Sequence, residues 1–252
     1  MNTNNQTKNE IHNIFDRYKV MVNINDTKDE DMKGILSTLI QNIVPADCPD
    51  AYIVKGDYAY GVEHFRISQY RVRGKSDLSL QAQGVVKDRS KMKQDFDEEL
   101  KPSLNNLNNA LFNNLESHSK SFKTYKENVT TITDISESHY RLIIFVEDVT
   151  ESAYIVKKND TKVINPLLLS FVVDAFENHK ESVWGIIYSW GNEKQKEITG
   201  CTLKELLERK SQNKLLDWNE YIPFEEGRRI FKSKQNEELD RNIVHIKLCD
   251  RL

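Results

Sequence analysis

Hydrophobic spacing changes from a helical to a strand-like period within the first seventy residues. Apolar residues recur three and four positions apart in 11–18, which predicts a first amphipathic helix. A second stripe runs from Met32 to Ile43 behind a capping-box pair, Thr27 and Glu30, and predicts a second helix. Pro45 and the Pro49-Asp50 dipeptide are expected to end it.

Two strand-like runs follow, Ala51–Val54 and Tyr58–Ile67. The tripeptide Lys55-Gly56-Asp57 separates them, and a short polar loop with a glycine is typical of a β-hairpin. Farther along, Leu142–Val146 and Val183–Trp190 are continuous apolar runs, which favour buried strands. The chain therefore contains at least four candidate strands.

Helices are predicted between and after these strands. A leucine stripe marks one from about 102 to 120, Asn165-Pro166 opens another, and Thr202 with Glu205 forms a capping box for a third that ends near Lys210. One more short strand is expected at Ile243–Leu248. Helices that alternate with apolar strands favour an α/β fold with one mixed central sheet flanked by helices.

The chain of 252 residues is 38% hydrophobic and 30% charged, which is typical of a globular protein. We expect a single α/β domain over 1–252, with a disordered tail at 1–9, a core at about 28–190 and a C-terminal extension at 200–252. No apolar run is long enough for a transmembrane helix, and no secretory signal is visible. Three widely spaced cysteines favour a reducing, cytoplasmic location.

A local basic segment stands out against the net charge of −3. The interval from Arg66 to Lys93 contains eight basic residues and only Asp77 and Asp88 as acids. Such a segment could contact phosphate groups or form a solvated surface. The candidate phosphate-binding residues are Arg71, Arg73, Lys75, Lys87 and Arg89.

The predicted hairpin carries a pair of carboxylates. Alternation places Glu63 and Phe65 on one face of their strand and His64 on the other. Asp50 begins the preceding strand, so the hairpin can bring its carboxylate near Glu63. Two close carboxylates repel each other, and a divalent cation such as Mg²⁺ or Mn²⁺, which takes oxygen ligands, resolves that repulsion.

This stretch resembles the PD-(D/E)xK nuclease superfamily. The motif of that superfamily reads here as Pro49-Asp50, twelve residues, and Glu63-His64-Phe65, and the resemblance covers mainly residues 28–190. It implies a restriction-endonuclease-like core of a helix, a β-meander, a helix and a further strand. It also implies that Asp50 and Glu63 are metal ligands in a DNA-cleaving site, and that the biological role is in restriction, phage defence or mobile elements.

The sequence departs from the motif at Phe65, where the superfamily has a lysine that orients water and stabilises charge. The candidates for that role from a neighbouring element are Lys75 and Lys55, and Lys75 is the candidate catalytic lysine. The alternative is a catalytically degenerate binding or interaction protein on the same fold, or an interaction protein of unrelated fold.

Structural roles for the same residues are also open. Asp50 could cap a turn and Glu63 could pair with Arg66 or a cross-strand base. Glu147 and Asp148 could add to a site at the strand end or form a polar strand exit. We expect no membrane partner, and the C-terminal region could form a homo-oligomer or bind a partner protein.

Overall fold

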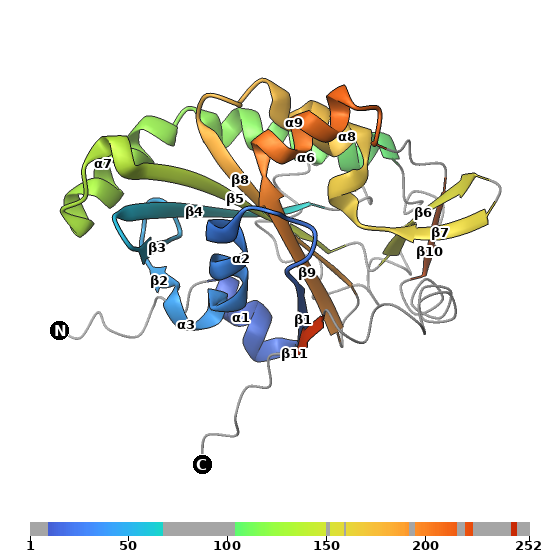
Figure 1. The fold of residues 1–252 in the computed structure, drawn as a ribbon, viewed down its shortest axis with the longest axis horizontal. Coiled ribbons are helices and arrows are strands. Elements are labelled where there is room, and N and C mark those ends of the chain that lie inside the picture. Colours follow the sequence, from blue (N-terminus) through green and yellow to red (C-terminus); the bar gives the residue numbers. More distant parts are fainter. Residues whose placement is uncertain are drawn as a thin grey trace, which may run out of the picture.

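A computed structural model describes residues 10–67, 104–149, 152–158, 160–191, 195–215, 220–223 and 243–245 of the chain. Within these residues the protein is an α/β structure in which helices cover both faces of a mixed sheet (Figure 1). A separate three-stranded sheet has the order β10 (Glu220–Pro223), β6 (Ser152–Lys158) and β7 (Asp160–Ile164).

The main sheet has eight described strands. Their spatial order is β11 (Ile243–His245), β1 (Lys19–Asn23), β9 (Gln195–Thr202), β8 (Val183–Gly191), β5 (Tyr140–Asp148), β4 (Tyr58–Ile67), β3 (Ala51–Lys55) and β2 (Val44–Pro45). Strands β4, β5 and β8 are mutually parallel, while β3 and β9 run antiparallel to their neighbours β4 and β8. The expected strands at 58–67, 142–146 and 183–190 therefore do share one sheet.

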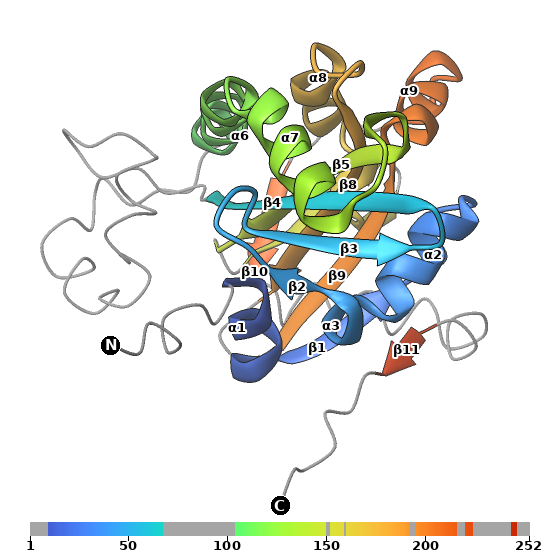
Figure 2. The same cartoon turned by 90° about the vertical axis from the view of Figure 1, so that its left-hand side faces the viewer.

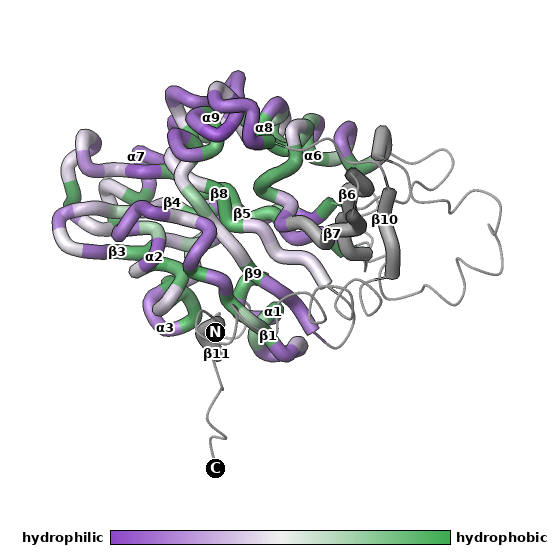
Figure 3. The backbone as a smooth tube through the Cα atoms, turned by 45° about the vertical axis from the view of Figure 1, so that its right-hand side comes forward, coloured by the Kyte–Doolittle hydropathy of each residue, from purple (hydrophilic) through white to green (hydrophobic). Residues whose placement is uncertain are grey.

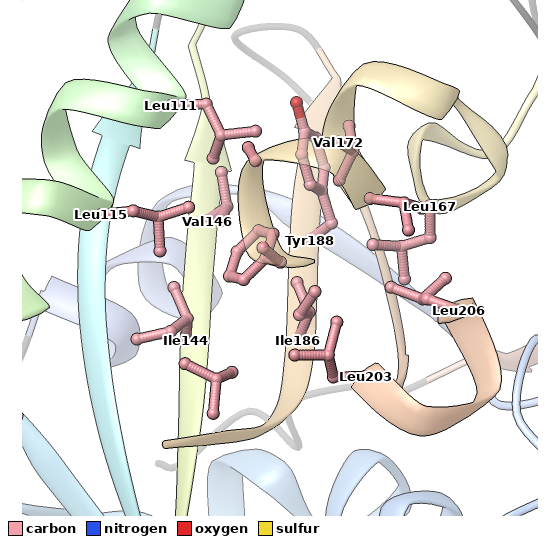
Figure 4. Close-up of a cluster of buried hydrophobic side chains, with 14 of the residues drawn as sticks. Leu111, Leu115, Ile144, Val146, Leu167, Val172, Ile186, Tyr188, Leu203 and Leu206 are labelled. Carbon is pink, nitrogen blue, oxygen red and sulfur yellow. The ribbon is translucent and has the colours of Figure 1, made fainter. Parts of the chain in front are cut away.

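One face of the sheet is covered by the later helices. These are α6 (Leu104–Ser119), α7 (Phe122–Thr133), α8 (Ser170–Glu177), which follows the short 3-10 helix η3 (Pro166–Leu168), and α9 (Leu203–Ser211). The leucine stripe of α6 packs on this face through Leu107, Leu111 and Leu115, as the sequence predicted. Figure 4 shows Leu111 and Leu115 meeting Ile144 and Val146 of β5.

The opposite face is covered by the N-terminal helices α1 (Glu10–Arg17), α2 (Glu30–Ser37) and α3 (Leu39–Asn42). They pack on the alternate side chains of the same strands, including Ile143 and Phe145 of β5. Figure 2 shows the sheet between the two helical layers. In Figure 3 the middle of β8 is coloured hydrophobic, whereas much of α9 is hydrophilic, as expected for a central strand and a covering helix.

Two local expectations have different outcomes. The capping box of α9 is present, since Thr202 and Glu205 exchange their side-chain and backbone hydrogen bonds. The expected Thr27–Glu30 box is wrong: Asp29 caps α2 by accepting from the Met32 amide, and the Thr27 hydroxyl donates to Glu205 instead. Because α2 begins at Glu30, the N-cap position falls on Asp29, and Thr27 lies two residues before it.

Candidate functional site

The hairpin of β3 and β4 brings the two predicted acids to neighbouring positions. Ala51 pairs with Val62 in the antiparallel register, so the next positions outward on the two chains are Asp50 and Glu63. The Asp50 Oδ2 atom accepts a hydrogen bond of 2.8 Å from the His64 backbone amide. The Asp50 carboxylate is therefore anchored to β4 directly beside Glu63.

Alongside burial, the carboxylates of Glu63 and Asp50 both raise the pKa of the Cys48 thiol. Burial raises the pKa of Cys48, and the nearby carboxylate of Glu63 raises it further, with Asp50 and Asp47 acting in the same direction. Cys48 is thus held as a neutral thiol, which is a poor nucleophile. Since both carboxylates affect this one thiol, Asp50 and Glu63 both lie close to Cys48.

Glu63 is 5% exposed and faces α6 and α7. Its Oε1 atom lies 2.5 Å from Nδ1 of His118, at the end of α6, and the Tyr125 hydroxyl of α7 also hydrogen-bonds to it. Burial, followed by the charge of Glu63, raises the pKa of Tyr125 well above its usual value. The Glu63 carboxylate is therefore held by side chains from two helices.

Phe65 fills the motif's lysine position with a core side chain. It is 3% exposed, and its ring stacks on that of His118 at 5.6 Å between centroids and 23° between planes. Lys55 is engaged elsewhere, because its ammonium donates to the Asp31 carboxylate at 3.0 Å and to the backbone carbonyls of Glu30 and Asp31. Lys55 therefore fastens the hairpin to α2.

A second polar cluster lies on the opposite face of the sheet. Glu147 of β5 contacts His64 at 3.4 Å, Arg66 at 2.9 Å and Lys196 of β9 at 3.7 Å. These charge partners outweigh the effect of its burial and lower the pKa of Glu147 to about 2. His64 joins the two groups, because its backbone holds Asp50 and its side chain contacts Glu147.

This second cluster differs from a solvated strand exit. Glu147, Asp148 and Lys196 are each 2% exposed or less. The Lys196 ammonium donates to the Asp148 backbone carbonyl at 3.0 Å and lies 5.2 Å from the Tyr18 ring centroid. Glu147 and Asp148 are the last residues of β5, at the carboxyl ends of the parallel strands, where open α/β sheets commonly place ligand sites. Glu63 lies nearer the middle of β4, opposite Ile144 of β5.

A surface groove of about 590 Å³ opens beside Cys48. It runs between the segment before β3 and helix α7, and its lining includes Asp47, Cys48, Tyr52 and Asn128. Asn128 also donates to the Cys48 carbonyl at 2.9 Å, which fixes one wall to the other. A ligand in this groove would lie beside the thiol on which both carboxylates act.

The acid pair fits a divalent cation in donor type. Mg²⁺ takes hard oxygen ligands, and one or two carboxylates with retained waters are a common set for it. Among the described residues, no group of three or more His, Cys, Asp and Glu side chains is arranged to hold a metal ion. Asp50 and Glu63 would therefore provide the protein ligands of a two-carboxylate site.

Some candidate residues lie outside the described part of the chain: Arg71, Arg73, Lys75, Lys87 and Arg89. Sequence reasoning in turn missed His118, Tyr125 and Lys196. The leucine stripe of α6 held the signal for His118, which follows Leu115 by three residues and so falls on the same buried face. Lys196 gave no such signal, since a lysine in a polar run reads as a surface residue.

A scan against protein-family models found no matching family, and no curated protein or solved structure matched the chain. None of the helices among the described residues combines the length and apolarity that a membrane crossing needs.

Proposed function

We propose that this protein is a divalent-metal-dependent phosphodiesterase that acts on DNA, with Asp50 and Glu63 as its metal ligands. The observation that carries the proposal is the register of β3 and β4, which makes the two acids neighbours at the mouth of a hairpin. The metal, Mg²⁺ or Mn²⁺, would neutralise charge on the phosphate and favour the ionisation of water. An interaction protein of unrelated fold has no need of this juxtaposition.

The order of elements supports the same proposal. Among the described residues, helices α2 and α3, the meander β2–β3–β4, helices α6 and α7 and the parallel strand β5 come in this order along the chain. This is the order expected of a restriction-endonuclease-like core. The basic segment that follows β4 in the sequence would supply phosphate contacts from Arg71, Arg73, Lys75, Lys87 and Arg89, with Lys75 in the role of the motif lysine. A role in restriction, phage defence or mobile elements goes with this proposal.

A catalytically degenerate binding protein on the same fold is the second candidate. The position of Phe65 favours it, because this ring is part of the core and stacks on the histidine that holds Glu63. Such a protein would bind DNA or a partner without cleaving it. The C-terminal region remains our candidate surface for a partner protein or a second copy.

Cleavage of supercoiled, linear and single-stranded DNA in Mn²⁺ and in Mg²⁺ tests the first candidate. We expect cleavage that EDTA abolishes and that Asp50→Asn or Glu63→Gln reduces by about 100-fold or more, because each variant removes a ligand charge. Asp57→Asn is the matched control, since Asp57 is an exposed acid in the turn of the same hairpin. It should cleave within about twofold of the wild-type rate.

Folding must be measured beside activity, because Glu63 also has structural partners. Urea unfolding should show that Asp50→Asn and Glu63→Gln remain folded at the assay temperature. If the wild-type protein binds DNA but cleaves none of the three substrates with either metal, the binding-protein candidate replaces the enzyme.

A further inference from the structure

The turn between α6 and α7 directs two side chains at Glu63. The Ser121 amide donates to the His118 carbonyl at 2.9 Å, and the Tyr125 amide donates to the Ser121 carbonyl at 2.9 Å. These bonds fix the last turn of α6 against the first turn of α7. His118 and Tyr125 thus come from one rigid corner, which we term the α6–α7 corner (118–125).

This corner occupies the carboxylate closely. His118 Nδ1 lies 2.5 Å from Glu63 Oε1 and 3.2 Å from the Tyr125 hydroxyl, which itself hydrogen-bonds to Glu63. The imidazole is fixed from its other side by the stacked ring of Phe65. The corner is therefore a specific clamp on Glu63, and both of its contacts are to the proposed metal ligand.

The short nitrogen–oxygen distance decides what can lie between these atoms. Two donors at right angles around Mg²⁺, each about 2.1 Å from the ion, are about 3.0 Å apart. A separation of 2.5 Å is too small for an ion shared in that geometry and is a direct contact between the nitrogen and the oxygen. A cation on Oε1 and His118 in its observed position are therefore alternatives.

We propose that the α6–α7 corner is an autoinhibitory latch: His118 and Tyr125 hold Glu63, and a divalent cation that binds Glu63 Oε1 must displace His118. This inference rests on the metal site proposed above. It assigns the corner a role opposite to that of a ligand, because removing its donors strengthens metal binding.

Mn²⁺ affinity, measured by titration calorimetry and by the loss of the free-ion electron paramagnetic resonance signal, tests the latch without any cleavage assay. His118→Phe keeps an aromatic ring on Phe65 and removes the nitrogen. We expect the Kd for Mn²⁺ to fall about tenfold or more, the effect of a lost hydrogen bond to a charged group. Tyr125→Phe should lower the Kd in the same direction. His118→Ala serves as the second variant if His118→Phe does not fold.

His179→Phe is the matched control, because His179, which follows the end of α8, also contacts a glutamate, Glu116, at 3.5 Å. Its Kd should stay within about twofold of wild type. A Kd that rises in His118→Phe overturns the latch and makes His118 a metal ligand, and an unchanged Kd overturns it as well.

The proposed metal site and the latch fail in different ways. If wild type binds Mn²⁺ and Glu63→Gln does not, the site stands and the His118 variants alone decide the latch. If wild type binds weakly or not at all and His118→Phe binds, the latch is supported directly. Absence of binding in wild type, His118→Phe and Tyr125→Phe overturns both proposals.

Discussion

Glu147 shows how a single buried carboxylate can be more stabilising when charged than when neutral. It has less than 3% of its surface exposed, yet Arg66, His64 and the ammonium of Lys196 surround it and lower its pKa to about 2. Burying the Lys196 ammonium without partners would cost free energy, but it donates to the Asp148 carbonyl and lies 3.7 Å from the Glu147 carboxylate. Removing one member of the cluster therefore leaves another buried charge without its partner.

The lowered pKa of Glu147 predicts a specific loss of stability in acid. A group whose pKa is depressed on folding stabilises the protein above its unfolded value, here 4.5, and that contribution disappears as pH falls toward about 2. The difference corresponds to roughly 3 kcal/mol. Urea unfolding of wild type and Glu147→Gln should show a gap in the free energy of unfolding that is full at pH 6 and shrinks progressively below pH 5.

At neutral pH we expect Glu147→Gln to cost about 3–5 kcal/mol, because Lys196 stays buried beside a neutral partner. Glu116→Gln is the control, since Glu116 has a similar contact with His179 but a half-exposed side chain. A gap between wild type and Glu147→Gln that stays constant from pH 6 to pH 3 would contradict the depressed pKa.

At the scale of elements, one of the two predicted capping boxes is present, and the other is replaced by the local cap Asp29. Thr202 and Glu205 form their box within one helical turn, and sequence spacing was enough to find it. Thr27 has the same spacing from Glu30, but Glu205 lies across the fold and accepts its hydroxyl at 2.6 Å. No local pattern can reveal an acceptor 178 positions away in the sequence.

The two roles of Glu205 predict an unequal pair of substitutions. Glu205 accepts from the amide of Thr202, the N-cap of α9, and from the Thr27 hydroxyl and Lys28 amide before α2. Thr202→Ala should cost about 1 kcal/mol as a lost cap, and Glu205→Ala should cost about 2–3 kcal/mol because it also releases the Thr27–Lys28 segment. Urea unfolding measures both.

Glu208→Ala, an exposed change in the same helix, is the control and should fall within about 0.5 kcal/mol of wild type. A double-mutant cycle between Thr27→Ala and Glu205→Ala should show a coupling energy of at least about 0.5 kcal/mol. Additive costs in that cycle would mean that the contact between α9 and the start of α2 contributes nothing to stability.

At the scale of the whole molecule, the sequence predicted the middle of the sheet and a strand at its far edge, β11, but not β1 and β9 between them. Leu142–Val146 and Val183–Trp190 are buried on both faces and read as strands directly. Strand β9 also lies inside the sheet, but its polar residues do not match the apolar pattern of a buried strand. These residues are buried with partners that are distant in the sequence: the Lys196 ammonium donates to the Asp148 carbonyl, and the Thr199 hydroxyl donates to Asp26 at 2.5 Å.

The acid pair was predictable for a related reason. Asp50 and Glu63 are joined by a short hairpin, so sequence spacing alone fixes their approach. The partners of Glu63 were not predictable in the same way, since the distance from β4 to α6 and α7 depends on how two helices pack on the sheet.

The shared sheet predicts that the two cores unfold as one. Strand β5 contributes alternate residues to both, with Ile143 in the core under α1–α3 and Ile144 in the core under α6–α9. Each is fully buried, so Ile143→Ala and Ile144→Ala should each cost about 2–5 kcal/mol. Neither face can lose its packing alone, because both depend on the same strand staying in register.

Two tryptophans report on the two cores separately. Trp184 packs against the α1–α3 core and Trp190 lies in the α6–α9 core. In proteins that keep only one of them, with the other two tryptophans changed to Phe, both fluorescence signals should give the same urea midpoint, and Ile143→Ala or Ile144→Ala should lower both midpoints together. If one of these substitutions lowers the urea midpoint reported by one tryptophan and not by the other, the two cores are independently stable. That result would contradict the prediction, because a sheet shared by both cores should lose its packing on both faces together.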